Sequence, residues 1–195
     1  MKRARRTNAE WSEATTAALV RRAREAFGEA GYAAASVEQI AEEAGLTKGA
    51  VYYHFRSKKG LFEAVFRDVS REIVTRIEER ADAAPDPWEA VAAGCEAFLD
   101  VALDDELRQI ALVDAPNVLG WATWRAIDGE HGLGALKAGL RACGGACEEL
   151  DTDTLALLLS GAMNEGVLCI AEAPDRAATH ERVRLSLRAL LAVAR

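Results

Sequence analysis

Hydrophobic residues recur every three or four positions along almost the whole chain, the spacing that places them on one side of an α-helix. No segment alternates apolar and polar residues as a β-strand does, and no internal repeat is present. The pattern therefore predicts an all-α protein of about nine helices. The expected helical segments cover roughly residues 12–31, 36–45, 47–55, 57–81, 86–102, 105–114, 117–142, 152–171 and 175–194, with a kink or break in 117–142 because glycines interrupt it.

The second and third segments have clear start and stop signals. Ser36 and Gln39 predict a capping box, in which the Ser36 hydroxyl accepts from the backbone of Gln39 and the Gln39 side chain reaches back. Gly45 is expected to end that helix in the left-handed conformation. Thr47 and Ser57 are placed to cap the next two helices. Two short helices joined by a tight turn form a helix-turn-helix arrangement.

Charge divides the chain near the end of this arrangement. The net charge of −7 argues against a nucleic-acid binder, yet residues 1–60 hold 11 Lys and Arg against 7 Asp and Glu. A basic module on an acidic body is suited to DNA without sticking to every polyanion. We therefore expect a basic flexible arm over 1–11, a DNA-binding domain over 12–60 and a helical body over 61–195. The arm either follows the DNA or is only a solubilising tail.

Composition excludes several other classes of protein. With 50% hydrophobic residues the chain is not disordered. The longest apolar stretch, 155–171, is interrupted by Asn164 and Glu165 and is shorter than the ~20 residues of a membrane span. The N-terminus is basic but lacks the apolar segment of a signal peptide. A soluble, cytoplasmic protein with no membrane partner is expected.

Four cysteines, Cys95, Cys143, Cys147 and Cys169, are expected to be reduced thiols in such a protein. Cys143 and Cys147 are spaced for a redox pair or half a metal site, but two glycines between them break any helix and no histidines complete a metal set. We expect packing roles for them, and no metal or cofactor. No paired carboxylates, Glu-x-x-His, nucleophile elbow or phosphate loop indicates an enzyme.

Residues 36–62, SVEQIAEEAGLTKGAVYYHFRSKKGLF, closely resemble the DNA-binding domain of the TetR family of bacterial repressors. Phe27-x-x-x-Gly31-Tyr32 is similar to the end of that family's first helix. The resemblance covers about residues 15–65, and the all-helical remainder fits the family's ligand-binding and dimerisation domain in length and helix count. The resemblance implies a homodimeric transcriptional repressor that a small hydrophobic effector releases from a palindromic double-stranded DNA operator.

The third expected helix carries most of the candidate DNA contacts. Lys48 is long enough to reach guanine O6 and N7, and small residues beside it allow the helix end to approach the groove. Tyr52 lies on the face opposite the inward Val51 and Phe55, at the reach of backbone phosphates. The resemblance adds phosphate clamps at the starts of the flanking helices. The candidate DNA-binding residues are Ser36, Thr47, Lys48, Gly49, Ala50, Tyr52, Tyr53, His54 and Lys58.

The last two expected helices, 152–171 and 175–194, carry apolar stripes and small residues that permit close helix packing. The resemblance implies that they pair with their symmetry mates in a four-helix bundle. The alternative is that both stripes pack only within one protomer.

The other helices of the body hold more aromatic residues than one core obviously needs, which is typical of an apolar ligand pocket. The alternative is an ordinary hydrophobic core. The candidate ligand-binding residues are Phe66, Trp88, Cys95, Phe98, Trp121, Trp124, Asn164 and Glu165. Two other functions stay open: a thiol- or metal-responsive sensor on the same DNA-binding scaffold, and a regulator with no small ligand.

Overall fold

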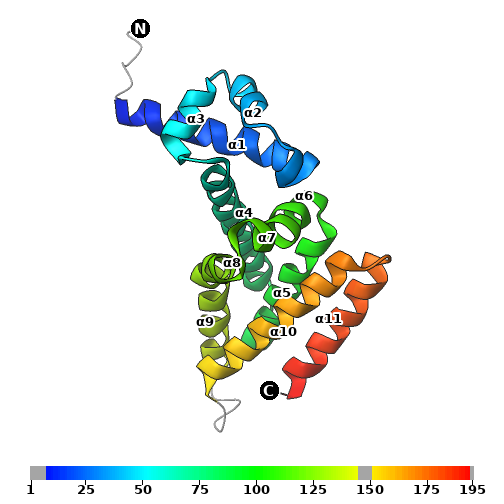
Figure 1. Ribbon diagram of the computed structural model, residues 1–195. Coiled ribbons are helices and arrows are strands. Elements are labelled where there is room, and N and C mark those ends of the chain that lie inside the picture. The colour runs from blue at the N-terminus through cyan, green and yellow to red at the C-terminus, as the bar shows by residue number, and fades with distance from the viewer. Residues whose placement is uncertain (1–7, 145–150, 194–195) are drawn as a thin grey trace.

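The computed structural model describes residues 8–144 and 151–193, and every regular element in them is helical, which confirms the all-α prediction (Figure 1). The α-helices are α1 (Asn8–Ala34), α2 (Val37–Glu43), α3 (Lys48–Phe55), α4 (Lys58–Asp82), α5 (Pro87–Asp100), α6 (Asp105–Leu107), α7 (Ala115–Leu119), α8 (Trp121–Asp128), α9 (Gly134–Ala142), α10 (Thr152–Glu172) and α11 (Arg176–Val193). A 3-10 turn, η1 (Val101–Leu103), and two π-helical stretches, η2 (Arg108–Asp114) and η3 (Gly129–Leu133), complete the order. Most of the expected N-terminal arm, residues 1–7, lies outside the described residues.

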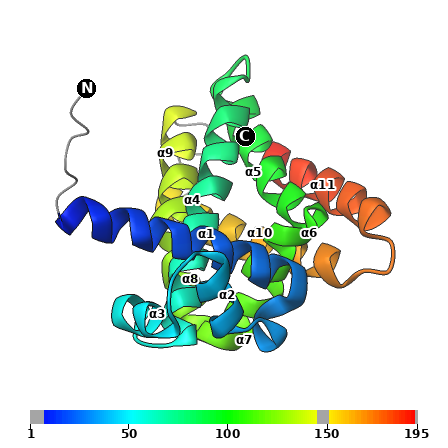
Figure 2. The same cartoon turned by 90° about the horizontal axis from the view of Figure 1, so that it is seen from above.

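Helices α1, α2 and α3 form a small module at one end, and α4 leaves it to run through the body (Figure 1). At 1.5 Å per residue, the 25 residues of α4 span about 37 Å. Seen from above, α9 and α11 lie on opposite sides of α4 and α5 (Figure 2). Helix α4 is thus part of both the N-terminal module and the body.

Side-chain caps start the helices of the module much as the sequence predicts. Ser36, Thr47 and Ser57 each accept a hydrogen bond from the backbone N–H three residues on. The reciprocal half of the capping box is absent, because the Gln39 side chain donates to Glu43 instead, at 3.1 Å. The three predicted N-caps are confirmed because a cap depends on only four consecutive residues.

Two glycines fix the turns on either side of α3. Gly45 has a φ of +70°, a conformation that a side chain makes costly, and it turns the chain from α2 toward α3. A Cβ on Gly60 would lie 2.1 Å from the carbonyl oxygen of Phe55, so only glycine lets the end of α3 approach the start of α4 this closely. The orientation of α3 on α4 therefore depends on Gly60.

Helix boundaries differ from the prediction where the chain bends without stopping. Helix α1 begins at Asn8, before the expected start, and continues through a kink at Gly31 to Ala34. The segment 117–142, expected to kink, is divided at Gly120 and again by the π-helical η3. Helical hydrogen bonding resumes after each bend, and hydrophobic periodicity does not show where such bends fall.

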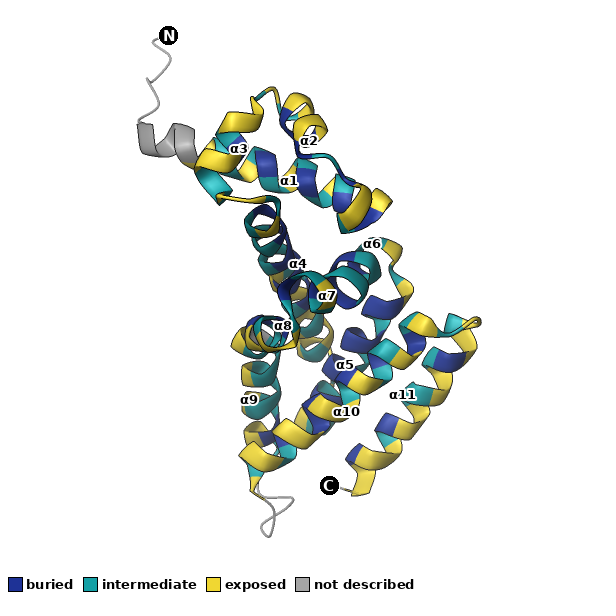
Figure 3. Cartoon of the chain, in the orientation of Figure 1, coloured by how far each residue is buried: buried dark blue, intermediate teal, exposed yellow. Residues whose placement is uncertain are grey.

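The buried side chains form one continuous cluster that passes from the module into the body. At the junction, the ring of Phe62 on α4 packs edge-on against Phe27 and Tyr32 of α1, each at 5.1 Å between centroids. Exposed residues gather on the outer sides of α2, α3, α10 and α11 (Figure 3). Because of these contacts, a movement of α4 would displace α1.

Candidate nucleic-acid interface and ligand cavity

The outward face of α3 presents the candidate base-reading residues to solvent. Val51 points inward and is fully buried, whereas Tyr52 is 40% and Tyr53 80% exposed. Gly49 is exposed, and a Cβ there would lie 3.7 Å from the Thr47 hydroxyl, so the start of α3 is not crowded. The Lys48 Nζ lies 5.8 Å from the centre of the Tyr52 ring, which places the two on one face. An exposed helix start of this kind has the shape that can enter a major groove.

Lys48 is paired with Glu38 of α2, an interaction that sequence reasoning missed. The hydrogen bond from Lys48 lowers the pKa of Glu38 from its ordinary value. Both side chains are at least half exposed, so the pair is weak and readily exchanged. In the free protein, Glu38 therefore occupies one of the three N–H donors of the Lys48 ammonium.

Other predicted contacts are already engaged inside the module. His54 is half-buried, and its Nδ1 lies 3.4 Å from the Thr16 hydroxyl of α1, so it does not share the open face of Tyr52. Lys58 places its Nζ 4.6 Å from the centre of the Tyr32 ring and donates to the Ala33 carbonyl at 3.4 Å. Each holds the helices of the module together in the free protein.

The remaining predicted DNA contacts lie where the two short helices begin. Ser36 and Thr47 use their hydroxyl oxygens as caps, and Ala50 donates its backbone N–H to Thr47. Thr47 is exposed and Ser36 is half-buried, and the first backbone N–H groups of a helix can bind a phosphate.

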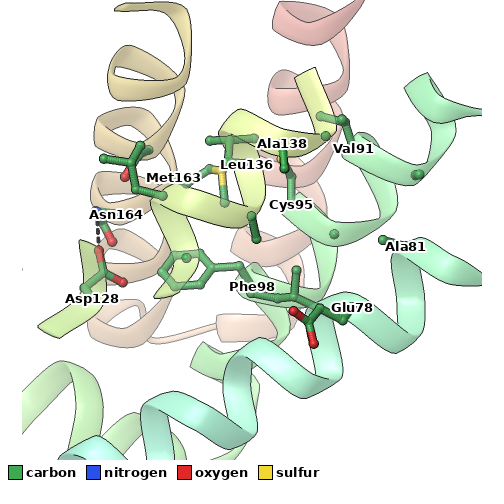
Figure 4. A pocket seen from close by; sticks show the side chains of 18 of the residues that line it. Glu78, Ala81, Val91, Cys95, Phe98, Asp128, Leu136, Ala138, Met163 and Asn164 are labelled. Carbon is green, nitrogen blue, oxygen red and sulfur yellow. Dashed lines mark hydrogen bonds between the residues drawn. The ribbon is translucent and has the colours of Figure 1, made fainter. Parts of the chain in front are cut away.

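A cavity of about 280 Å³ lies in the body, walled by α4, α5, α9 and α10 (Figure 4). Three predicted residues, Cys95, Phe98 and Asn164, line it. Most of the wall is aliphatic or consists of small residues that leave room for a guest. The other lining residues are Ile77, Glu78, Ala81, Asp82, Ala90, Val91, Gly94, Asp128, Gly132, Leu133, Ala135, Leu136, Ala138, Gly139, Ser160 and Met163.

Asp128 and Asn164 form the polar end of this cavity, and sequence reasoning missed Asp128. The Asn164 amide nitrogen donates to Asp128 Oδ2 at 3.4 Å (Figure 4). Arg125 donates to the same oxygen at 3.1 Å. Asn164 is 4% exposed, and its Oδ1 is buried without a hydrogen-bond donor among the described residues. Burial raises the pKa of Asp128, and the Asn164 hydrogen bond and Arg125 oppose that shift.

The other predicted ligand residues lie outside this cavity. Phe66 and Trp124 line a neighbouring cavity of only about 30 Å³. Trp88 is half-buried against the core. Trp121 is 59% exposed and stacks on Trp124, and Glu165 is exposed on the outer side of α10. Four of these residues were predicted because they are aromatic. In the fold, their side chains pack in the core or are exposed to solvent instead of lining the main cavity.

The three cysteines in the described part of the chain form no disulfide with one another. Cys95 is buried, and burial raises the pKa of its thiol to about 12, so it carries no thiolate near neutral pH. The half-buried Cys143 donates to the Gly139 carbonyl, and Cys169 is exposed. Cys147 lies outside the described residues. Over residues 8–144 and 151–193 no three His, Cys, Asp or Glu side chains gather as a metal site.

An ion-pair cluster joins the module to the body. Arg24 of α1 contacts Glu72 of α4 at 2.6 Å, Asp68 of α4 at 3.6 Å, and Glu106 of α6. Burial alone would lower the pKa of Arg24, but its hydrogen bonds to Glu72 and Glu106 outweigh this and raise it. A single α1 side chain therefore holds both α4 and the body in place.

Helix α10 is the one helix among the described residues that is long and apolar enough to cross a membrane. It packs against α5, α9 and α11, and 39% of its apolar window is buried. A core helix of a globular protein has the same length and composition, so this feature is weak evidence of a span.

Comparisons with known proteins agree with this arrangement. Residues 19–65 match the family model of the bacterial regulatory proteins of the TetR family, and residues 88–193 match that of the tetracycline repressor-like C-terminal domain. A solved TetR-family transcriptional regulator from Pectobacterium atrosepticum is 35% identical, with a TM-score of 0.83, over 95% of this chain and 96% of that one.

Two curated relatives share shorter stretches. The Tn10 TetC protein of Escherichia coli is 32% identical over 65% of this chain and 64% of its own length. The transcriptional regulator SrpR of Pseudomonas putida is 35% identical over 55% of this chain and 48% of its own. The matched region thus spans about half to two thirds of these relatives. Since two family models together cover both halves of the chain, the protein belongs to the TetR family of DNA-binding transcriptional regulators.

Proposed function

We propose that the protein is a homodimeric repressor that a small hydrophobic effector releases from a palindromic operator. The observation that carries this proposal is the shared helix α4. Its start packs against α1 through Phe62 and Phe27, and its end, at Ile77 and Ala81, lines the cavity. A guest that displaces the end of α4 also displaces the module.

The outer faces of α10 and α11 support the dimer. Large apolar side chains are exposed there in the single chain, and such a patch on one surface indicates a partner. These residues are Leu157, Leu158, Leu185, Leu190 and Val193. A second copy related by a two-fold axis would bury them and place two α3 helices one DNA turn, about 34–36 Å, apart.

The effector acts only if it prefers one spacing of the two recognition helices. A ligand that binds both spacings equally shifts nothing, however tightly it binds. We expect the guest in the cavity to favour a tilt of α4 that the Arg24 cluster transmits to α1. The recognition helices then no longer fit successive major grooves.

Selection from a random duplex library, followed by sequencing of the bound DNA, tests the proposal. We expect a palindrome with half-sites one helical turn apart, lost in the Lys48→Ala/Tyr52→Ala double variant. The matched control is Glu42→Ala, at an exposed residue of α2 outside the candidate DNA contacts. Salt-sensitive binding without sequence preference, unchanged by the double variant, would contradict operator recognition.

A further inference from the structure

We propose that the cavity selects a hydrophobic primary or secondary ammonium ion, whose N–H groups donate to Asn164 Oδ1 and Asp128 and whose apolar body lies against Phe98 and Leu136. The inference rests on the proposed effector function, and it assigns the chemical class of the effector.

The orientation of the Asn164 amide follows from its partner. An ionised carboxylate only accepts hydrogen bonds, so the amide nitrogen must face Asp128 Oδ2, 3.4 Å away. The amide oxygen then points the other way. It is buried and has no donor among the described residues, and the Asn164 residue that carries it lines the cavity. Buried acceptors are rarely left unpaired, so this oxygen calls for a donor supplied by the guest.

Asp128 presents a second free acceptor. Both of its hydrogen bonds, from Asn164 and from Arg125, go to Oδ2, and none of the described residues donates to Oδ1. Two acceptors of adjacent side chains therefore border the same space. A single ammonium nitrogen carries enough N–H groups to serve both.

The sign of the charge on the lining separates an ammonium from other donors. Asp128, Glu78 and Asp82 line the cavity, and no lysine or arginine is among the described lining residues. A carboxylate guest would meet the like charges of the exposed Glu78 and Asp82 and of Asp128, whose charge Arg125 only partly offsets, and acceptors that it cannot satisfy. A neutral alcohol could donate a hydrogen bond but would gain nothing from the charges.

The rest of the cavity determines the body of the guest. Leu136, Met163, Val91, Phe98 and Ile77 form an apolar wall. With a volume of about 280 Å³, the cavity is at the small end of ligand sites, which commonly measure ~300–1,000 Å³. One aromatic ring on a short alkyl chain suits this space.

Calorimetry with four probes of one shape tests the inference: 4-phenylbutylamine, 4-phenylbutanol, 4-phenylbutyrate and trimethyl(4-phenylbutyl)ammonium. We expect the amine to bind about tenfold more tightly than the alcohol and the carboxylate not to bind. The quaternary ion keeps the charge without an N–H group, so it should bind about tenfold more weakly than the amine. A carboxylate that binds as well as the amine, or an amine that does not bind, would overturn the proposal.

Asp128→Asn is the matched variant, because it keeps the shape and removes the charge. We expect it to weaken the amine by about 10–100-fold and the alcohol by less than twofold. Glu79→Gln removes the same charge from an exposed site outside the cavity and should change neither. Melting curves of all variants verify folding. An unchanged amine affinity in Asp128→Asn would reject the site.

Operator binding in the presence of each probe separates this inference from the function on which it rests. If the amine binds in a way that depends on Asp128 but the operator stays bound, the ammonium site is supported and the proposal that an effector releases the operator is rejected. Release of the operator by the alcohol or the carboxylate, with no effect of the amine, would keep effector control and reject the ammonium assignment.

Discussion

The recognition helix and the cavity hold their polar residues in opposite surroundings. Tyr53 on α3 is 80% exposed, whereas Asn164 in the cavity is 4% exposed. Exposed side chains are solvated before they meet a partner, so exchanging them costs the free protein little. A polar pair inside an apolar wall loses its water and leaves acceptors unpaired, which costs stability. Variants of α3 should therefore change DNA affinity alone, and variants of the cavity should change stability as well.

The exposed apolar residues of α10 and α11 form the proposed dimer face. They differ from both regions, because they are exposed in one chain and buried in the proposed dimer, and substituting them should have the largest effect. Leu158 on α10 is 66% exposed. We expect Leu158→Glu to leave the melting of the protomer unchanged, to abolish the dimer, and to weaken operator binding more than 100-fold, since one half-site supplies too few contacts. Analytical ultracentrifugation and fluorescence anisotropy measure these effects.

Trp121→Glu is the control for that variant, because Trp121 is similarly exposed, at 59%, but lies on α8. Its mass in solution should remain that of a dimer. A wild-type protein that sediments as a monomer at micromolar concentration, or a Leu158→Glu protein that remains dimeric, would show that α10 and α11 pack only within the protomer.

Arg24 lies on the boundary between the two regions and should affect both. Arg24→Gln removes its ion pairs to α4 and α6 at a site that is 21% exposed, so the expected loss of stability is about 1 kcal/mol, or about 2–4 °C in Tm. Operator affinity without effector should stay within twofold. The effector concentration needed for release should rise about tenfold, because the body no longer holds the module.

Arg22→Gln is matched to that variant, since Arg22 lies on the same helix but pairs with Glu25 of α1, within one helix turn. It should leave both Tm and effector response unchanged. Equal effects of the two substitutions would mean that charge, and not the junction, controls the response.

The local part of the fold could be predicted from the sequence. The caps Ser36, Thr47 and Ser57 and the left-handed Gly45 depend on a few consecutive residues, so the module and its outward face followed from the pattern. Lys48 could be placed on that face in the same way. Its partner Glu38 is ten residues away on another helix, and helical periodicity gives no information about contacts across a turn.

The cavity could not be predicted to the same degree. Asp128 and Asn164 are 36 residues apart and meet only after α8 and α10 pack in the same body. Trp121 was predicted as a ligand contact from its aromatic type but is exposed, because the division of the chain at Gly120 turns it outward. Residue type predicts burial on average, whereas the direction of a side chain in a broken helix depends on where the break falls.

A substitution of Glu38 should have a smaller effect, on operator affinity alone. Glu38→Gln frees Lys48 and removes a negative charge from the recognition surface, so we expect operator affinity to rise about threefold. Glu42→Gln removes the same charge from an exposed residue of α2 and leaves the Lys48–Glu38 pair in place, so it should raise affinity less. Anisotropy titrations at two salt concentrations measure both. A loss of affinity in Glu38→Gln would mean that the pair positions Lys48 for DNA.

The smallest expected effect tests the cost of the buried carboxylate. Burial raises the pKa of Asp128, so its ionised form is less favourable in the folded than in the unfolded chain, and the resulting loss of stability develops as pH rises through the two pKa values. Asp128→Asn should therefore raise Tm slightly near pH 7 and match the wild type near pH 4. Asp105 is its opposite, because a hydrogen bond from Arg176 lowers the pKa of that carboxyl. Asp105→Asn should lower Tm near pH 7, and equal signs for the two variants would refute the contrast between a solvated and a buried carboxylate.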